Sequence, residues 1–243
     1  MNPNVRIFSD LNELTSCAAQ VIKESIDRAE NGQYFLSLAG GNTPRALYEL
    51  LAKDYAAKIV WSNVQLFWGD ERYVSANDSR SNFRMVQETL LRHVTIPKNQ
   101  IHPILTNYQD PDGAARAYEI TLRKYFRSTW PRFDLTILGL GSDGHTASIF
   151  PGSTALENKS TRWVIVTQAP IEPKQRITLT LPVLSNSKQI FFIVTGSDKA
   201  NALSRTLSND ADVQSFPAAG ICQKNSSVTF WADRDAAGRL SLQ

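Results

Sequence analysis

The chain has 243 residues, of which 42% are hydrophobic and 20% charged, a composition typical of a globular protein with a substantial core. Its formal net charge of +3 is dispersed along the sequence, which argues against nucleic acid as the main partner and suits a small anionic ligand. No apolar stretch approaches the roughly 18 residues that a membrane-spanning helix requires, so no membrane partner is expected.

In the N-terminal half, apolar strands alternate with amphipathic helices. Asp10 begins the first helix with Glu13 as its capping-box partner, and Asn31–Gly32 ends it. Pro44 suits the first turn of the second helix. In chain order, the predicted elements are a strand at 5–8, a helix at 11–29, strands at 34–38 and 64–68 separated by a helix at 44–51, and helices at 83–91 and 112–127.

In the C-terminal half, residues 133–138 form a continuous apolar run that predicts a strand buried on both faces. Further strands are predicted at 163–167, 190–194 and 228–231, with an alternating segment at 176–181 and helices near 199–203 and 235–240. Strands alternating with helices imply right-handed βαβ units. We therefore predict an α/β fold in which one domain, residues 1–243, has a doubly wound, mostly parallel sheet with helices on both faces.

The cysteines and the N-terminal residues predict the compartment of the cell in which the protein works. Cys17 and Cys222 are far apart and neither lies in a CxxC pair, so reduced structural thiols are expected rather than a disulfide or a metal site. Residues 1–6 lack a basic region followed by an apolar block, so no secretion signal is expected. These features predict a cytoplasmic protein.

Glycine-rich polar loops follow several predicted strands, and on a parallel sheet such loops meet at one edge. The first, Gly40, Gly41, Asn42 and Thr43, is typical of an anion cradle because glycines let the backbone approach a ligand and the next helix directs free N–H groups toward it. A plain tight turn with a helix cap is the alternative. A P-loop is excluded because no lysine follows the second glycine.

Three cationic residues and one acid near the other predicted strands are further candidates for binding a ligand or for catalysis. Asp70 and Arg72 follow the strand at 64–68, where Asp70 can accept a proton and Arg72 can hold a phosphate or an oxyanion. Lys199 stands in the first turn of a helix, where a cation opposes the helix dipole unless it reaches toward an anion. Arg176 opens a buried segment. For each of them, a solvated surface position is the alternative.

Asp143 and His145 follow the buried strand at 133–138 on a turn rich in glycine. An acid and an imidazole at this edge are suited to general acid–base chemistry. Neither a metal site nor a dinucleotide site is favoured, because no third metal ligand is identifiable and no acid lies about 20 residues further on to bind a ribose. We therefore expect no metal and no cofactor.

Taken together, these segments resemble the 6-phosphogluconolactonases, within the wider superfamily of glucosamine-6-phosphate deaminases. The resemblance spans most of the chain in the family's order and rests on GGNTP (40–44), DER (70–72), DSRSN (78–82), DGHTASIFP (143–151), RITL (176–179) and TGSDK (195–199). It implies a Rossmann-like fold and hydrolysis of 6-phospho-D-glucono-1,5-lactone to 6-phosphogluconate in the oxidative pentose phosphate pathway. It also implies a cytoplasmic enzyme that is a monomer or a weak homo-oligomer.

Two positions favour the lactonase branch over the deaminase branch. The deaminases that resemble this sequence carry a glutamate where this chain has Phe150, and they typically have tyrosine where it has Arg72. One position departs from the lactonase pattern, because Ala219 stands where the family commonly has serine. A deaminase or sugar-phosphate isomerase, and a non-catalytic sugar-phosphate sensor, remain the alternatives.

The implied chemistry needs an activated water, a stabilised oxyanion and a proton for the departing ring oxygen. We expect His145 to activate water and to return its proton, since an imidazole can do both near neutral pH. Either Asp70 or Asp143 would orient the imidazole, and we favour Asp70. The resemblance places the substrate phosphate on Gly41, Asn42 and Thr43 together with Arg72, Arg176 and Lys199.

Overall fold

The computed structural model describes residues 4–29, 32–156 and 161–240. Its main sheet is parallel throughout and is built from β1 (Asn4–Phe8), β2 (Tyr34–Leu38), β3 (Val64–Trp68), β5 (Ile101–His102), β6 (Leu135–Leu138), β9 (Gln189–Val194) and β10 (Val228–Asp233). The seven strands lie in the order β1-β10-β9-β6-β2-β3-β5. The predicted mostly parallel α/β sheet is confirmed.

A second, antiparallel sheet corrects the prediction of a single sheet. It consists of β4 (Asp70–Arg72), β7 (Val164–Gln168) and β8 (Gln175–Leu179), in the order β4-β8-β7. Residues 70–72 were expected to be a loop, but β4 follows β3 after Gly69 and pairs with β8. The N–H of Leu179 donates to the Gly69 carbonyl at 2.9 Å, which joins the two sheets at this point.

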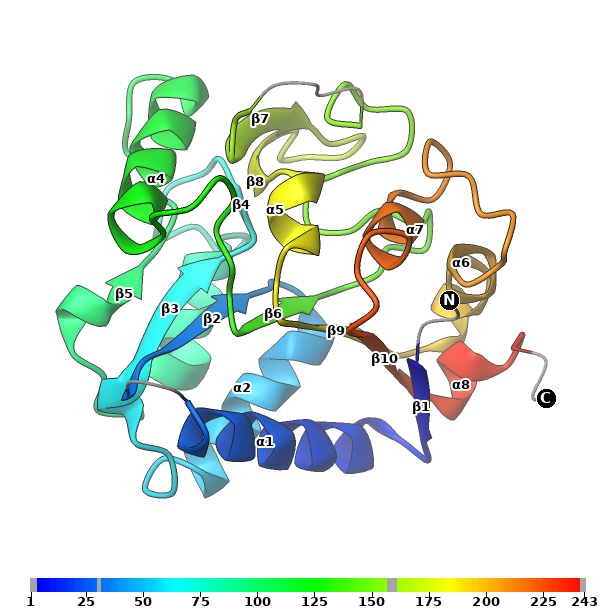
Figure 1. Cartoon of the computed structure of the whole chain (residues 1–243), viewed down its shortest axis with the longest axis horizontal. Helices are drawn as coiled ribbons and strands as arrows, with labels where there is room; N and C mark the ends of the chain where they lie inside the picture. Colours follow the sequence, from blue (N-terminus) through cyan, green and yellow to red (C-terminus); the bar gives the residue numbers. More distant parts are fainter. Residues whose placement is uncertain (1–3, 30–31, 157–160, 241–243) are drawn as a thin grey trace.

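Helices cover both faces of the main sheet, as predicted. They are α1 (Leu11–Asp27), α2 (Asn42–Asp54), α3 (Asn82–Val86), α4 (Pro111–Tyr125), α5 (Leu181–Ser185), α6 (Ala200–Thr206), α7 (Pro217–Cys222) and α8 (Arg234–Ala237). Figure 1 shows α1 and α2 on one side of the sheet and α5 and α7 on the other. Helix α4 packs against β7 and β8 of the small sheet.

The start of α1 shows how the sequence determines a helix boundary. Asp10 caps the helix, because its carboxylate accepts the N–H of Glu13 at 2.9 Å. The Glu13 carboxylate reaches back to the N–H and hydroxyl of Ser9 rather than to Asp10, so the predicted capping box is shifted by one residue. The helix ends at Asp27, earlier than predicted, and Asn31 lies outside the described residues.

The core is a continuous apolar cluster around the main sheet. All five residues of β3 are buried, as expected for a parallel strand with both faces covered. Aromatic rings pack together where β2, β3 and the end of α4 meet, with Phe67 against Phe126 and Phe133. No helix in the described ranges has the length and apolar character to cross a membrane.

Candidate active site

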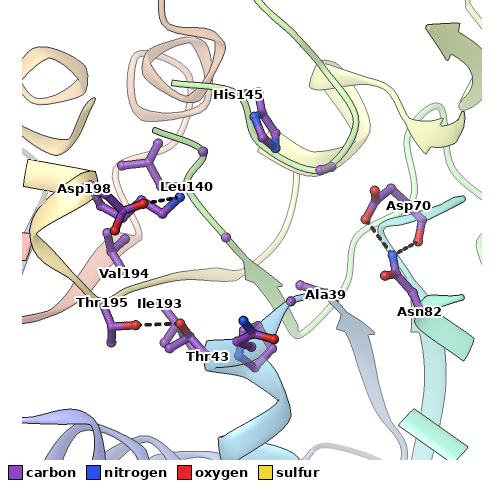
Figure 2. A pocket seen from close by; sticks show the side chains of 18 of the residues that line it. Ala39, Thr43, Asp70, Asn82, Leu140, His145, Ile193, Val194, Thr195 and Asp198 are labelled. Carbon is purple, nitrogen blue, oxygen red and sulfur yellow. Dashed lines mark hydrogen bonds and ion pairs between the residues drawn. The ribbon is translucent and has the colours of Figure 1, made fainter. Parts of the chain in front are cut away.

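A cavity of about 410 Å³ lies where β2, β3, β6 and β9 end. In an open α/β sheet, ligands bind at the carboxyl ends of the strands, and these four strands are neighbours in the sheet. Figure 2 shows side chains from these segments around the cavity. Its walls include Ala39, Gly40, Gly41, Asn42, Thr43, Asp70, Arg72, Asn82, Gly139, Leu140, Gly141, His145, Ala147, Thr195, Asp198 and Lys199.

Beyond β6, the chain folds back so that Asp143 holds His145. Asp143 Oδ1 lies 2.6 Å from His145 Nδ1 and accepts the backbone N–H of His145 at 3.1 Å. Burial opposes ionisation of Asp143, but its contacts with His145 hold the pKa of that carboxyl below its usual value. With Asp143 at Nδ1, Nε2 is the ring nitrogen available to a ligand.

In the structure Asp143 contacts the imidazole and Asp70 bonds to Ser148, so the geometry favours Asp143 over the expected Asp70 as the acid beside His145. Both acids follow buried strands, so their sequence positions alone do not distinguish them. The glycine at 141 explains why the pair forms, because a Cβ there would overlap His145 Nδ1 and Asp143 Oδ1. The N–H of Gly141 also donates to the His145 carbonyl at 2.8 Å and closes the turn.

Phe150 packs against His145, the partner of Asp143. Its ring is 8% exposed, and its centroid lies 4.7 Å from that of the His145 imidazole, with an angle of 40° between the planes. An apolar ring thus lies against the imidazole at the position where the deaminases that resemble this chain carry a glutamate. His145 therefore meets a carboxylate at Asp143 and a hydrocarbon surface at Phe150.

Asp70 lies on a different wall of the cavity and is 7% exposed. Its Oδ2 accepts the Ser148 hydroxyl at 2.6 Å. Asn82 Nδ2 donates to the Asp70 carbonyl at 3.0 Å and approaches Oδ1 at 3.4 Å, as Figure 2 shows. The carboxylate is thus held by the 145–148 segment on one side and by α3 on the other.

The predicted anion cradle forms the start of α2. Gly41 precedes the helix with a φ of +106°, a conformation that glycine adopts readily. Gly40 leaves the space that the Asn82 amide occupies. Thr43 Oγ1 lies 2.7 Å from Thr195 Oγ1, so the hydroxyls after β2 and β9 meet at the cavity (Figure 2). Free backbone N–H groups at this helix start make it suitable for an anion.

Two of the three predicted cations line the cavity. Lys199 Nζ lies 3.2 Å from the Asp198 carboxylate in a short turn (Ser197–Lys199) that precedes α6. Arg72 donates to the Arg80 carbonyl at 2.6 Å.

Arg176 is buried beside Arg72, opposite it in the β4–β8 pair, and is not among the described residues that line the cavity. Burial, followed by the charge of Arg72, lowers the pKa of Arg176, whose Nε and Nη1 have no hydrogen-bond partner among the described residues.

Glu71 is buried and supports the part of the cavity wall that Asn82 forms. It is 2% exposed, and its carboxylate accepts the N–H groups of Arg72, Asn82 and Phe83, each at 2.7 Å. The Ser81 hydroxyl adds a hydrogen bond at 3.1 Å. Burial raises the pKa of Glu71 to about 7, although the backbone N–H groups favour its charged form. Glu71 thereby fixes the start of α3 and the position of Asn82.

Several site residues were not identified from the sequence. Asn82 closes the polar DSRSN segment directly after the helix-capping Ser81, and Thr195 directly follows an apolar strand, so both had a recognisable signal. Ser148 lies in the DGHTASIFP segment that carries the family resemblance, but no local pattern indicated its contact with Asp70, which is distant in sequence. Among the described residues, no cluster of three His, Cys, Asp or Glu side chains could hold a metal ion.

Comparisons with known proteins agree on one family. The family model described as glucosamine-6-phosphate isomerases/6-phosphogluconolactonase matches residues 9–231. The 6-phosphogluconolactonase of Mycobacterium tuberculosis is 38% identical over 249 residues, covering 99% of each chain. That of Synechocystis is 37% identical, again over 99% of each chain. The crystal structure of 6-phosphogluconolactonase from Leishmania guyanensis is 30% identical, covers 100% of both chains and superposes with a TM-score of 0.88.

Proposed function

The chain belongs to the glucosamine-6-phosphate isomerase/6-phosphogluconolactonase family, and we propose that the Asp143–His145 pair is its catalytic centre. The activity is that of its full-length relatives, hydrolysis of 6-phosphogluconolactone to 6-phosphogluconate in the pentose phosphate pathway. The observation that supports the catalytic assignment is the 2.6 Å contact between Asp143 Oδ1 and His145 Nδ1 at the edge of the cavity.

In this proposal, His145 Nε2 removes a proton from water while the water oxygen bonds to the lactone carbonyl carbon. Asp143 holds the imidazole in position and stabilises its protonated form. The tetrahedral intermediate then collapses, the bond between that carbon and the ring oxygen breaks, and His145 returns the proton to the departing oxygen. Water is consumed, and the products are a carboxylic acid and the freed hydroxyl.

The substrate phosphate is assigned to the start of α2. The N–H groups after Gly41, the Thr43 hydroxyl and Lys199 lie on one part of the cavity wall and can share the phosphate charge. Arg72 reaches the cavity from β4 and is available to the phosphate or to the developing oxyanion. Buried beside it, Arg176 contributes positive potential rather than a direct contact.

Replacement of His145 tests the catalytic assignment. His145→Ala is expected to lower kcat for freshly prepared 6-phosphogluconolactone by about 10²- to 10⁴-fold, the usual contribution of a general base. The rate must be corrected for spontaneous hydrolysis of the lactone. The exposed His93, which hydrogen-bonds the Glu88 carbonyl, provides the matched control His93→Ala. Near-full activity of His145→Ala would show that another group activates water.

Phe150 distinguishes this reaction from deamination. A deaminase would release ammonia from glucosamine 6-phosphate, and an apolar ring against His145 offers no second carboxylate for that chemistry. We expect no ammonia release above background in a coupled assay. A non-catalytic sensor is disfavoured because it would have little use for the Asp143–His145 pair.

We also propose that the enzyme works in the cytoplasm, without a metal or an organic cofactor, as a monomer or a weak homo-oligomer. In support of a reducing compartment, Cys17 and Cys222 are both free. The dispersed net charge of +3 supports a small-molecule partner rather than nucleic acid. Light scattering coupled to size exclusion tests the oligomeric state.

A further inference from the structure

The backbone between His145 and Ser148 follows a path that several contacts determine. The Thr146 hydroxyl donates to the Gly139 carbonyl at 3.0 Å, and the N–H of Ile149 donates to the Thr146 carbonyl at 2.9 Å. Between them, Ala147 has a φ of +48°, in the left-handed region that residues with a Cβ rarely adopt. Such strain persists where the surrounding structure enforces it, and it is concentrated at functional sites.

Ser148 lies at the end of this turn and is 2% exposed. Its backbone is held by the small sheet, because its N–H donates to Thr178 Oγ1 at 3.3 Å and its carbonyl accepts the Thr167 hydroxyl at 2.8 Å. These contacts leave the Ser148 hydroxyl directed at Asp70, and Oγ donates to Oδ2 at 2.6 Å. A serine on the His145 segment thus bonds directly to an acid on β4.

Among the side-chain hydrogen bonds that described residues make to Asp70, the contact with Ser148 is the shortest. Asn82 Nδ2 lies 3.4 Å from Oδ1 and 3.0 Å from the Asp70 carbonyl oxygen. A hydroxyl bonded to a carboxylate at such a distance is a charge-assisted hydrogen bond, roughly twice as strong as a neutral one. Without it, a nearly buried carboxylate oxygen on the cavity wall would lose its partner.

We propose that Ser148 is a positioning residue, which holds the Asp70 carboxylate in the orientation that the substrate meets and ties it to the segment that carries His145. The proposal rests on the lactonase function proposed above, and it adds that Asp70, which lines the cavity, contacts the sugar ring. Ser148 acts through Asp70 and does not itself touch the substrate. This hydrogen bond links the wall that bears Asp70 directly to the segment that bears His145.

A double-mutant cycle tests this coupling. Ser148→Ala is expected to lower kcat by about tenfold and to change KM by less than about twofold, since the lost bond orients a group rather than binding substrate. In an Asp70→Ala background, the same substitution should cost less than about twofold, because neither the carboxylate nor any other side-chain acceptor for the Ser148 hydroxyl remains at position 70. Ser148→Thr keeps the hydroxyl and should recover more activity than Ser148→Ala.

Thr136→Val provides the matched control. It also removes a buried hydroxyl, but that hydroxyl bonds to Ser187 Oγ rather than to Ser148 or Asp70. Its effect on kcat should be the same factor in the wild-type and Asp70→Ala backgrounds, whatever it does to Tm. All variants are assayed below their measured unfolding temperatures, so that only folded protein is compared.

The proposal is overturned if Ser148→Ala keeps full kcat, or if its effect is equal in the two backgrounds. Either result would leave the lactonase function intact, because wild-type activity and the His145→Ala loss are measured separately. If the wild-type chain did not hydrolyse 6-phosphogluconolactone, the proposed function itself would fail.

Discussion

At the scale of single residues, the absence of a side chain at Gly141 allows the Asp143–His145 pair to form. We predict that Gly141→Ala lowers kcat by at least about 10²-fold, because the added methyl occupies the space of His145 Nδ1 and Asp143 Oδ1, and misplacement of a reacting group by about 1 Å has such effects. Steady-state assays measure the loss, and circular dichroism verifies the fold. Gly113→Ala is the control, since its Cβ would meet its nearest neighbour, Asp110, at 3.4 Å.

His102 leads to a prediction about pH. Burial lowers the pKa of His102 to about 4, and its Nε2 lies 2.8 Å from Gln65 Oε1. The unfolded chain protonates this histidine near pH ~6.5, so stability is complete above that pH and falls by up to about 3 kcal/mol as the pH drops toward ~4. Urea unfolding of His102→Gln between pH 7 and pH 5 should show a smaller decrease.

The same substitution at the exposed His93 is the matched control and should leave the pH dependence as in the wild type. If the wild type and His102→Gln lost stability equally on acidification, His102 would not be the group responsible. The measurement uses folding stability alone and needs no substrate.

At the scale of elements, Glu119 of α4 attaches the helix to the small sheet. Its Oε2 accepts the N–H groups of Trp163 and Val164 at 3.0 and 3.3 Å, and also Arg162 Nε at 3.0 Å, while Oε1 contacts Arg123. Burial opposes the charge, but these donors prevail and lower the pKa of Glu119. Stability from this carboxylate is therefore present at neutral pH and is lost as the pH falls through its lowered pKa.

We predict that Glu119→Gln lowers the free energy of unfolding by about 1–3 kcal/mol, because an amide cannot satisfy every donor that meets the carboxylate. The urea midpoint measures the change. Glu24→Gln, which removes an exposed pair with Arg28, should cost less than about 0.5 kcal/mol. Equal losses in the two variants would contradict a special role for Glu119.

The length of an element explains which parts of the fold the sequence predicted. Strands of the main sheet with four to six residues carry apolar runs or alternating apolar residues, and their predicted positions agree with the structure to within a few residues. β4 and β5 have only three and two residues, too few for a periodic pattern, and no strand was predicted at either position. Helix α7, with six residues beginning at Pro217, was missed for the same reason.

At the scale of the whole molecule, the site forms because the carboxyl ends of neighbouring strands meet. This rule brought the segments after β2, β3, β6 and β9 to one cavity, and it was available from the sequence. The side-chain partner of Asp70 could not be predicted from the sequence, because it depends on the small sheet. That sheet carries Asp70 to Ser148 and away from His145, and no local pattern indicates such a contact.

The described core is one apolar cluster that includes residues of both sheets, such as Phe67 of β3 and Ile177 of β8. We therefore predict that the chain unfolds as a single cooperative unit. Calorimetry should give one transition with equal calorimetric and van't Hoff enthalpies.

Saturation with 6-phosphogluconate should raise the midpoint temperature, Tm, of that single transition, because the product binds the folded state. At a concentration of ~100 Kd, the stabilisation is about 2.7 kcal/mol, which corresponds to a rise in Tm of roughly 5–10 °C for a chain of this size. Lys199→Ala should reduce the rise because it removes a cation from the cavity wall, whereas Lys23→Ala, in an ion pair of α1, should not. Two transitions of which only one responds to the ligand would mean that the two sheets unfold separately, and that binding stabilises only the part that holds the phosphate.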